Sequence, residues 1–140
     1  MTRHSNTDWG LLLLRVGMAS LLITLHGGPR LVRVFEYFVH GVPWSFVGLV
    51  AGIGFPFPLL FALLSTAADS IGAFFAGLGF LTRWAALIMA INMSVAAYFE
   101  HSHGDPFEPP ALHLLGALVL LISGPGAFSL DALLSKRSRT

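Results

Sequence analysis

Residues 57–79 read FPLLFALLSTAADSIGAFFAGLG, an almost unbroken apolar run with a single ionisable residue, Asp69, near its middle. A helix of roughly 20 mainly apolar residues is long enough to cross the hydrocarbon core of a bilayer, which is about 30 Å thick. Further segments of this kind, which approach that length, lie at about 9–25, 81–99 and 111–123. The sequence therefore predicts an all-α fold, a transmembrane four-helix bundle that forms a single integral membrane domain over residues 1–140.

The composition agrees with a chain whose main partner is the lipid bilayer. Of the 140 residues, 55% are hydrophobic and 11% are charged, whereas soluble domains carry about 25% charged residues. The net charge of +1 gives no field that would gather nucleic acid, so a nucleic-acid partner is not expected. The chain has no cysteine, which excludes disulfides, thiolate metal ligands and thiol relays on this chain. Redox chemistry would need a bound cofactor or a partner protein.

The region between the first two spans is too apolar for a plain aqueous loop. The first span is expected to be retained, because no small-residue cleavage pattern follows it, and to end at His26-Gly27-Gly28-Pro29. After it, apolar residues recur at helical spacing at Leu31, Val34, Phe35 and Phe38. This pattern predicts an interfacial amphipathic segment between spans one and two. A broken fifth span is the alternative.

Basic residues predict the orientation of the chain. With four spans, one face carries Arg3, Arg83, Lys136, Arg137 and Arg139, and the opposite face carries only Arg30 and Arg33. Because short cytoplasmic flanks are enriched in Lys and Arg, both termini are expected in the cytoplasm. The acidic, histidine-rich loop at residues 100–110 is then outside.

Three polar residues on three predicted spans, Arg15, Asp69 and Asn92, are the first candidates for a ligand-binding site. At a rise of about 1.5 Å per residue, Arg15 lies roughly 8 Å and Asp69 roughly 15 Å inside the cytoplasmic edge, and Asn92 lies at a depth similar to that of Asp69. One interpretation is a polar pocket for a ligand head group or a proton. The alternatives are a structural clamp in which Arg15 and Asp69 satisfy each other, and an Arg15 side chain that extends to the cytoplasmic surface.

The outer face adds histidines and carboxylates. His26 and Glu100 lie at the outer ends of spans, where they could bind one another or a ligand entering from that side. His101, His103 and His113 are weak candidates for metal ligands, because histidine with carboxylate suits zinc, copper or iron. No recognised metal-binding spacing is present, so a solvated acidic loop is favoured and no metal site is predicted.

Four motifs together resemble the DoxX family of small four-span membrane proteins. They are Arg15 with Gly17, His26-Gly27-Gly28-Pro29-Arg30-Leu31, Asp69 leading into the Gly77–Arg83 turn, and the ending Gly124-Pro125-Gly126-Ala127-Phe128-Ser129-Leu130-Asp131. The family usually has glutamate where this chain has Asp69, and lysine is common where it has Arg30. The resemblance implies a bacterial or archaeal inner (cytoplasmic) membrane and a quinone-facing subunit, similar to the membrane subunit of thiosulfate:quinone oxidoreductases.

Three functions are therefore open. The first is a subunit of a quinone-linked or sulfur-linked membrane oxidoreductase, which binds a quinone-like or lipid-like ligand at Arg15, Asp69, Asn92, His26 and Glu100 and depends on a protein partner or a homo-oligomer. No catalytic residue is assigned. The second is a non-catalytic anchor or assembly subunit of a larger complex. The third is a small proton-coupled transporter that uses Asp69.

Overall fold

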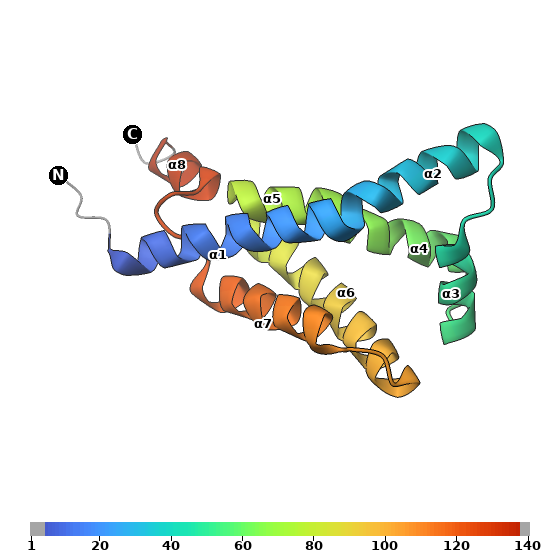
Figure 1. Cartoon of the computed structure of the whole chain (residues 1–140). Coiled ribbons are helices and arrows are strands. Elements are labelled where there is room, and N and C mark those ends of the chain that lie inside the picture. Colours follow the sequence, from blue (N-terminus) through green and yellow to red (C-terminus); the bar gives the residue numbers. More distant parts are fainter. Residues whose placement is uncertain (1–4, 138–140) are drawn as a thin grey trace.

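The computed structural model of the chain describes residues 5–137, and these form an all-α fold. Two long helical rods each contain a π-helical turn, and four simpler helices accompany them (Figure 1). The first rod comprises α1 (Asn6–Leu22), η1 (Ile23–Gly27) and α2 (Gly28–His40), and the second comprises α4 (Pro58–Ala67), η2 (Ala68–Gly72) and α5 (Ala73–Leu78). The remaining helices are α3 (Ser45–Ile53), α6 (Thr82–His103), α7 (Glu108–Ser123) and α8 (Leu130–Arg137).

The first rod is longer than the sequence predicts. The expected helix end at His26–Pro29 is wrong, because the helix continues without a break from α1 to His40. Pro29 follows the π turn η1, in which the Gly28 N–H donates to the Ile23 carbonyl five residues back. Proline has no backbone N–H and is tolerated in the first turn of a helical segment. The π turn before Pro29 therefore allows the helix to continue past the proline. Gly41, with φ of 67°, ends the rod in the left-handed conformation.

The segment after the π turn is helical, as the amphipathic pattern predicts, but it extends the first helix and is not a separate element. Its apolar side chains Leu31, Phe35 and Phe38 are exposed, and α2 has no buried residue. The separate helix of this region is α3, which follows the rod and packs on α4. The predicted segment is thus helical, and it consists of an extension of the first rod followed by the short helix α3.

The core lies where the two rods and the α6–α7 hairpin meet. The first rod crosses the second through contacts of α1 with α5 and of η1 with η2, and α6 packs along α7. The buried core is rich in small side chains: Ala19, Leu22, Ala73, Ala76, Ala85, Met89, Ala90, Met93 and Ala117. Small residues let helix backbones approach closely, which suits helices packed without a water-driven core.

Among the described residues, two helices are long and apolar enough to cross a membrane by length and composition, namely Asn6–His40 and Pro58–Leu78. An 18-residue stretch of each has a mean hydropathy of 1.6 and 1.7, respectively. Helices also occupy the predicted third and fourth spans, at Thr82–His103 and Glu108–Ser123. Both helices carry exposed large apolar side chains: Trp84, Ile88, Ile91, Tyr98, Leu112, Leu115, Val119 and Ile122. The start of α1 and helix α8 lie at the same end of the molecule (Figure 1).

Candidate functional site

A charged cluster forms where the two rods cross α6. Arg30 of α2 turns inward, and its Nη1 lies 2.5 Å from Oδ2 of Asp69. Asn92 of α6 donates its Nδ2 to the other carboxylate oxygen of Asp69 at 2.8 Å. The Asp69 side chain is 2% exposed and the Arg30 side chain 25%. The predicted contact between Asp69 and Asn92 is confirmed, but the cation that pairs with Asp69 is Arg30.

The two π turns position this cluster. Turns η1 and η2 contact each other, and Asp69 belongs to η2 while Arg30 follows η1 by three residues. Gly27 in η1 is packed so closely that an added Cβ would lie 2.3 Å from the Asp69 carbonyl oxygen. Only glycine permits this approach. π turns inside α-helices are frequent at functional sites, because they change the direction in which side chains project.

Arg30 has further neighbours that hold its guanidinium in place. Its Nη1 lies 3.5 Å from the Ser65 hydroxyl of α4. Its Cζ lies 4.0 Å from the centre of the Phe46 ring of α3, within the range of a cation–π interaction. The short helix α3 therefore contributes to the site by covering the cation.

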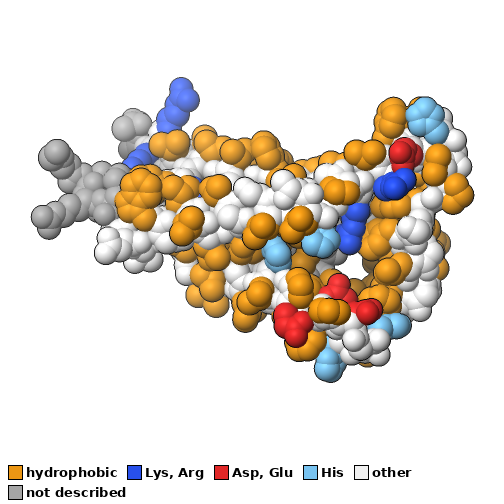
Figure 2. Space-filling view, viewed as in Figure 1, with side chains coloured by type: hydrophobic (Ala, Val, Ile, Leu, Met, Phe, Trp, Pro, Cys, Tyr) orange, Lys and Arg blue, Asp and Glu red, His pale blue; other side chains and the backbone are white. Residues whose placement is uncertain are grey.

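The cluster borders a cavity of about 630 Å³ between α3, α4, α6 and the start of α7. Its polar lining comprises Arg30, Ser65, Asp69, Asn92, His26, Glu100, Asp105 and His113, and most other lining residues are apolar. Figure 2 shows this side of the molecule hollowed, with basic, acidic and histidine side chains gathered around the hollow. An apolar cleft with a few convergent polar groups is the usual form of a small-molecule site.

His26 and Glu100 line the same cavity, so the structure brings both predicted outer residues to the Asp69–Asn92 cluster. His26 is exposed, and Glu100 is half-buried beyond the predicted third span. Burial raises the pKa of the Glu100 carboxyl, the Asp105 carboxylate adds to this increase, and Arg30 opposes it. Among the described residues, Arg30 is the only arginine or lysine of the lining, which also contains two histidines and the carboxylates of Asp69, Glu100 and Asp105.

Arg15 lies elsewhere. The predicted pair between Arg15 and Asp69 is wrong: Arg15 Nη1 donates to the Pro125 carbonyl at 2.8 Å, and Nη2 donates to the Phe128 carbonyl. Extension to the cytoplasmic surface is also wrong, because the residue is 1% exposed. Arg15 is not among the residues that line the cavity. The depths of Arg15 and Asp69 along the membrane normal suggest a pair. The guanidinium of Arg15 instead binds the main-chain carbonyls of the C-terminal segment.

The C-terminal segment that Arg15 holds is tied down at several further points. The Asp131 carboxylate accepts hydrogen bonds from the Leu81 N–H at 2.8 Å and the Thr82 N–H at 2.9 Å. The Asp8 carboxylate accepts from the Ala127 N–H at 2.9 Å. The Gly77–Arg83 turn and the Gly124–Asp131 ending noted in the sequence thus bind one another, and both serve to attach this segment to the bundle.

The weak metal candidates do not converge. His101 and His103 are exposed at the end of α6, and the His103 ring bonds with the Phe99 carbonyl of its own helix. His113 contacts the Pro109 carbonyl through Nδ1 at 2.8 Å and lines the cavity. Among residues 5–137, no group of three or more histidine or acidic residues is placed to hold a metal ion.

Arg30 is the functional candidate that sequence reasoning missed. It lies one residue after Pro29, where the helix was expected to end, and was therefore assigned to the outer surface. The basic position of the His26–Leu31 motif was the signal that could have found it.

Comparisons with known proteins agree with these motifs. The DoxX family model matches residues 10–102. The inner membrane protein YphA of Escherichia coli (strain K12) is 31% identical over 118 residues, an alignment that covers 73% of this chain and 84% of that protein. An uncharacterised protein of Haemophilus influenzae is 32% identical over 117 residues, covering 73% of this chain and 84% of that protein, and another is 29% identical over 122 residues, covering 76% and 81%. No solved structure matches the chain.

Proposed function

This chain belongs to the DoxX family and is an integral membrane protein, and we propose that it is a four-span subunit of a membrane redox system that binds the head of a quinone-like ligand beside Arg30, Asp69 and Asn92. The similarity to an inner membrane protein and the two long apolar helices confirm the predicted localisation. The observation that carries the proposal is the charged cluster at the wall of a cavity whose lining is mostly apolar.

The exposed surface supports four spans. At about 1.5 Å per residue, α6 is roughly 33 Å long and α7 roughly 24 Å, so α6 can cross the hydrocarbon core and α7 can do so with local thinning of the bilayer. Large apolar side chains are exposed on both helices, among them Trp84, Leu115 and Ile122. Contiguous apolar faces of this kind are stable against lipid and not against water.

The same arrangement supports cytoplasmic termini. Arg83 lies in the first turn of α6, and Lys136 and Arg137 end α8. The predicted opposite face loses Arg30, which turns inward to Asp69. Only Arg33 remains there as an outward basic residue of the described chain. Arg3 and Arg139, which also entered the prediction, lie outside the described residues. The excess of basic residues on the face that carries α8 favours its placement in the cytoplasm.

The chemistry of the lining favours a ligand whose head is uncharged. One arginine faces three carboxylates around the cavity, so a phosphate head group would meet repulsion from Asp69, Glu100 and Asp105. A quinone carbonyl can accept hydrogen bonds from the Arg30 guanidinium or the Asn92 amide, and a quinol hydroxyl can donate to a carboxylate. Nε2 of His113 is buried at this cavity and has no hydrogen-bond partner in the part of the chain that the structure describes. A buried polar atom without a partner costs stability, which a ligand oxygen would restore.

In this function the chain binds and orients the ligand. Asp69 and Glu100 are groups that can exchange the proton that accompanies quinone reduction. Redox centres that deliver electrons would belong to a partner protein, because the sequence has no cysteine to ligate a cluster.

A non-catalytic anchor subunit is the second candidate, and one observation favours it. The Asp69 carboxylate is already satisfied by Arg30 and Asn92 within the protein, and a self-satisfied buried pair can serve only to fix helix packing.

The two candidates differ in what copurifies with the protein. The protein purified in mild detergent should carry quinone detectable by mass spectrometry of the extracted lipids. Asn92→Leu should lose this quinone while eluting as the same single species, and the control Ser20→Ala, whose hydroxyl bonds to Val16 away from the cavity, should keep it. A stoichiometric protein partner without any quinone would favour the anchor.

A further inference from the structure

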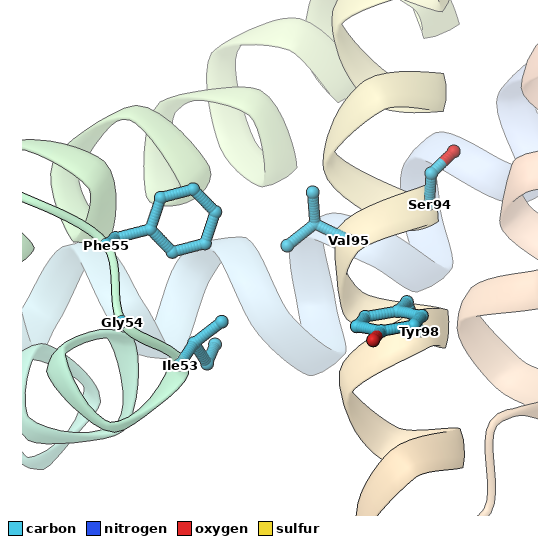
Figure 3. A pocket seen from close by; sticks show the side chains of 6 residues that line it. All are labelled: Ile53, Gly54, Phe55, Ser94, Val95 and Tyr98. Carbon is cyan, nitrogen blue, oxygen red and sulfur yellow. The ribbon is translucent and has the colours of Figure 1, made fainter.

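A second, smaller cavity lies beside the first. It has a volume of about 360 Å³ and is lined by Ile53, Gly54, Phe55, Ser94, Val95 and Tyr98. Figure 3 shows that these residues come from two walls, with Ile53, Gly54 and Phe55 at the end of α3 and the other three on α6. The side chains of Phe55 and Val95 face each other across the space (Figure 3).

The two cavities are neighbours with a common wall. Ile53, Phe55 and Val95 line both of them. The large cavity therefore continues sideways, between the end of α3 and α6, and away from the charged cluster at Arg30 and Asp69. The lining changes along this path, because the smaller cavity has no ionisable acid, base or histidine among its residues apart from the tyrosine.

The sideways path reaches a surface that suits lipid. Tyr98 on the far side of the smaller cavity is 74% exposed, and Trp84 of the same helix, which lines neither cavity, is also exposed. These residues belong to the outward apolar face of α6. An opening on such a face leads into the hydrocarbon or its boundary and not into water.

The backbone at the end of α3 forms one wall of the opening. Gly54 has φ of 93°, a left-handed conformation that ends α3 and reverses the chain. An added Cβ at Gly54 would meet no atom within 4 Å, so the glycine is required by the turn and not by close packing. The reversal places Ile53 and Phe55 on either side of the turn, both against the cavity.

We propose that this side opening, formed by Ile53, Phe55, Val95 and Tyr98, is the passage through which the hydrophobic tail of the ligand extends from the head site into the bilayer. The ligand is then a long-tailed amphiphile, of the class of isoprenoid quinones, that enters laterally from lipid. This inference rests on the proposed function for the head, and on the shared lining of the two cavities for the tail.

The absence of native cysteines permits a direct test of the opening. A fluorophore attached to Val95→Cys, in vesicles that contain brominated phospholipids, should be quenched by the brominated acyl chains and not by aqueous iodide. The same label at Trp84→Cys, which is 67% exposed on α6 away from both cavities, reports plain lipid contact, and the label at His103→Cys reports water. Quenching of the Val95 label by iodide alone would overturn a passage into lipid.

The tail is tested with two ubiquinones that share one head and differ in tail length. A bulky maleimide on Tyr98→Cys should weaken binding of the long-tailed ubiquinone at least tenfold and leave the short-tailed one unchanged, and the same maleimide on Trp84→Cys should affect neither. Long-tailed ubiquinone should also relieve the quenching of the Val95 label by brominated lipid, whereas the short-tailed form should not.

Each of the other possible outcomes would overturn a specific part of the proposal. An equal loss of both ubiquinones would mean that the label disturbs the head site, which overturns the tail passage. Quenching by brominated lipid that no ubiquinone relieves would assign the opening to a bilayer acyl chain. Spontaneous disulfide dimers of Tyr98→Cys would assign it to a second copy of the chain. Failure of both ubiquinones to bind the unlabelled protein would reject the proposed function, and the quenching result would still decide whether the opening leads to lipid.

Discussion

The first rod carries two inward-facing arginines, one in each half, and they differ in what they face. Arg15 is 1% exposed and donates to the main-chain carbonyls of Pro125 and Phe128. Arg30 is paired with a carboxylate, and its side chain keeps 25% of its surface open at the wall of a cavity. Arg15 thus attaches the C-terminal segment to α1 in a tightly packed region. Arg30 borders a cavity that has room for a ligand. A charged residue inside a span is a candidate for function, and the surrounding space decides between structure and function.

The largest effect is expected at Arg15. Arg15→Ala leaves the carbonyls of Pro125 and Phe128 without their donors and opens a gap beside Gly79, so the free energy of unfolding should fall by about 3 kcal/mol. Binding of ubiquinone by the folded fraction should stay unchanged, because Arg15 does not line the cavity. Unfolding in mixed detergent micelles measures the first effect and a binding titration the second. Weaker ubiquinone binding with unchanged stability would reverse the assignment of the two ends.

A smaller loss is expected at the crossing of the two rods. Gly27→Ala places a Cβ 2.3 Å from the Asp69 carbonyl oxygen, and overpacking of this kind costs about 2 kcal/mol. The matched control is Gly17→Ala in the same rod, where no atom lies within 4 Å of an added Cβ. Thermal unfolding should separate the two variants clearly. Similar melting temperatures would show that the rods are not held at this distance.

Double-mutant cycles on Asp69 compare the two arginines directly. Asp69→Leu combined with Arg30→Leu should give a coupling energy of about 1.5 kcal/mol, because the two side chains are in contact. Asp69→Leu combined with Arg15→Leu should give a coupling energy of less than about 0.5 kcal/mol, as expected for residues that share no partner. Equal coupling energies in the two cycles would restore the pair that the sequence suggested.

The smallest effect is expected in the outer loop. Replacing His101 and His103 by Ala should change the free energy of unfolding by less than about 0.5 kcal/mol, as is usual for exposed residues. His113→Ala offers the contrast, because His113 lines the cavity and should weaken ubiquinone binding. Loss of a bound metal ion together with a large drop in stability of the double variant would point to a metal site at these histidines.

Periodicity and apolar length were enough to predict three of the long helices, because residues 57–79, 81–99 and 111–123 all fall within observed helices to within a few residues, but they did not predict α8. The contact of Asp69 with Asn92 was also predictable. A carboxylate and an amide at the same depth in neighbouring helices can form a hydrogen bond, which neither group can form with lipid. The error lay at Gly27-Gly28-Pro29. These residues usually end a helix, and only tertiary packing against η2 shows that here they form a π turn inside one.

The prediction that Arg15 pairs with Asp69 was wrong for a different physical reason. Hydropathy and depth describe where a residue lies along the membrane normal. They do not describe the direction in which its side chain points from the helix axis or which segment lies beside it. The carbonyls that Arg15 binds belong to residues more than 100 positions away in sequence. No local pattern signals that the segment after α7 folds back to meet α1.

The paired π turns also have a consequence for the way this chain can change length. A π turn holds one residue more than an α turn needs, and each helical residue advances the chain by about 100° around the axis. If the same residues were wound as a regular α-helix, α2 would therefore be rotated by about that angle relative to α1, and Arg30 would turn away from Asp69. A chain one residue shorter at η1 would keep the orientation of α2 without the π turn. The mean hydropathy of the rod would hardly change. Two proteins could thus share the same hydropathy profile and the same number of helices while one of them lacks the charged cluster. A comparison of relatives at this site therefore depends on single-residue gaps in the alignment as much as on which residues are identical.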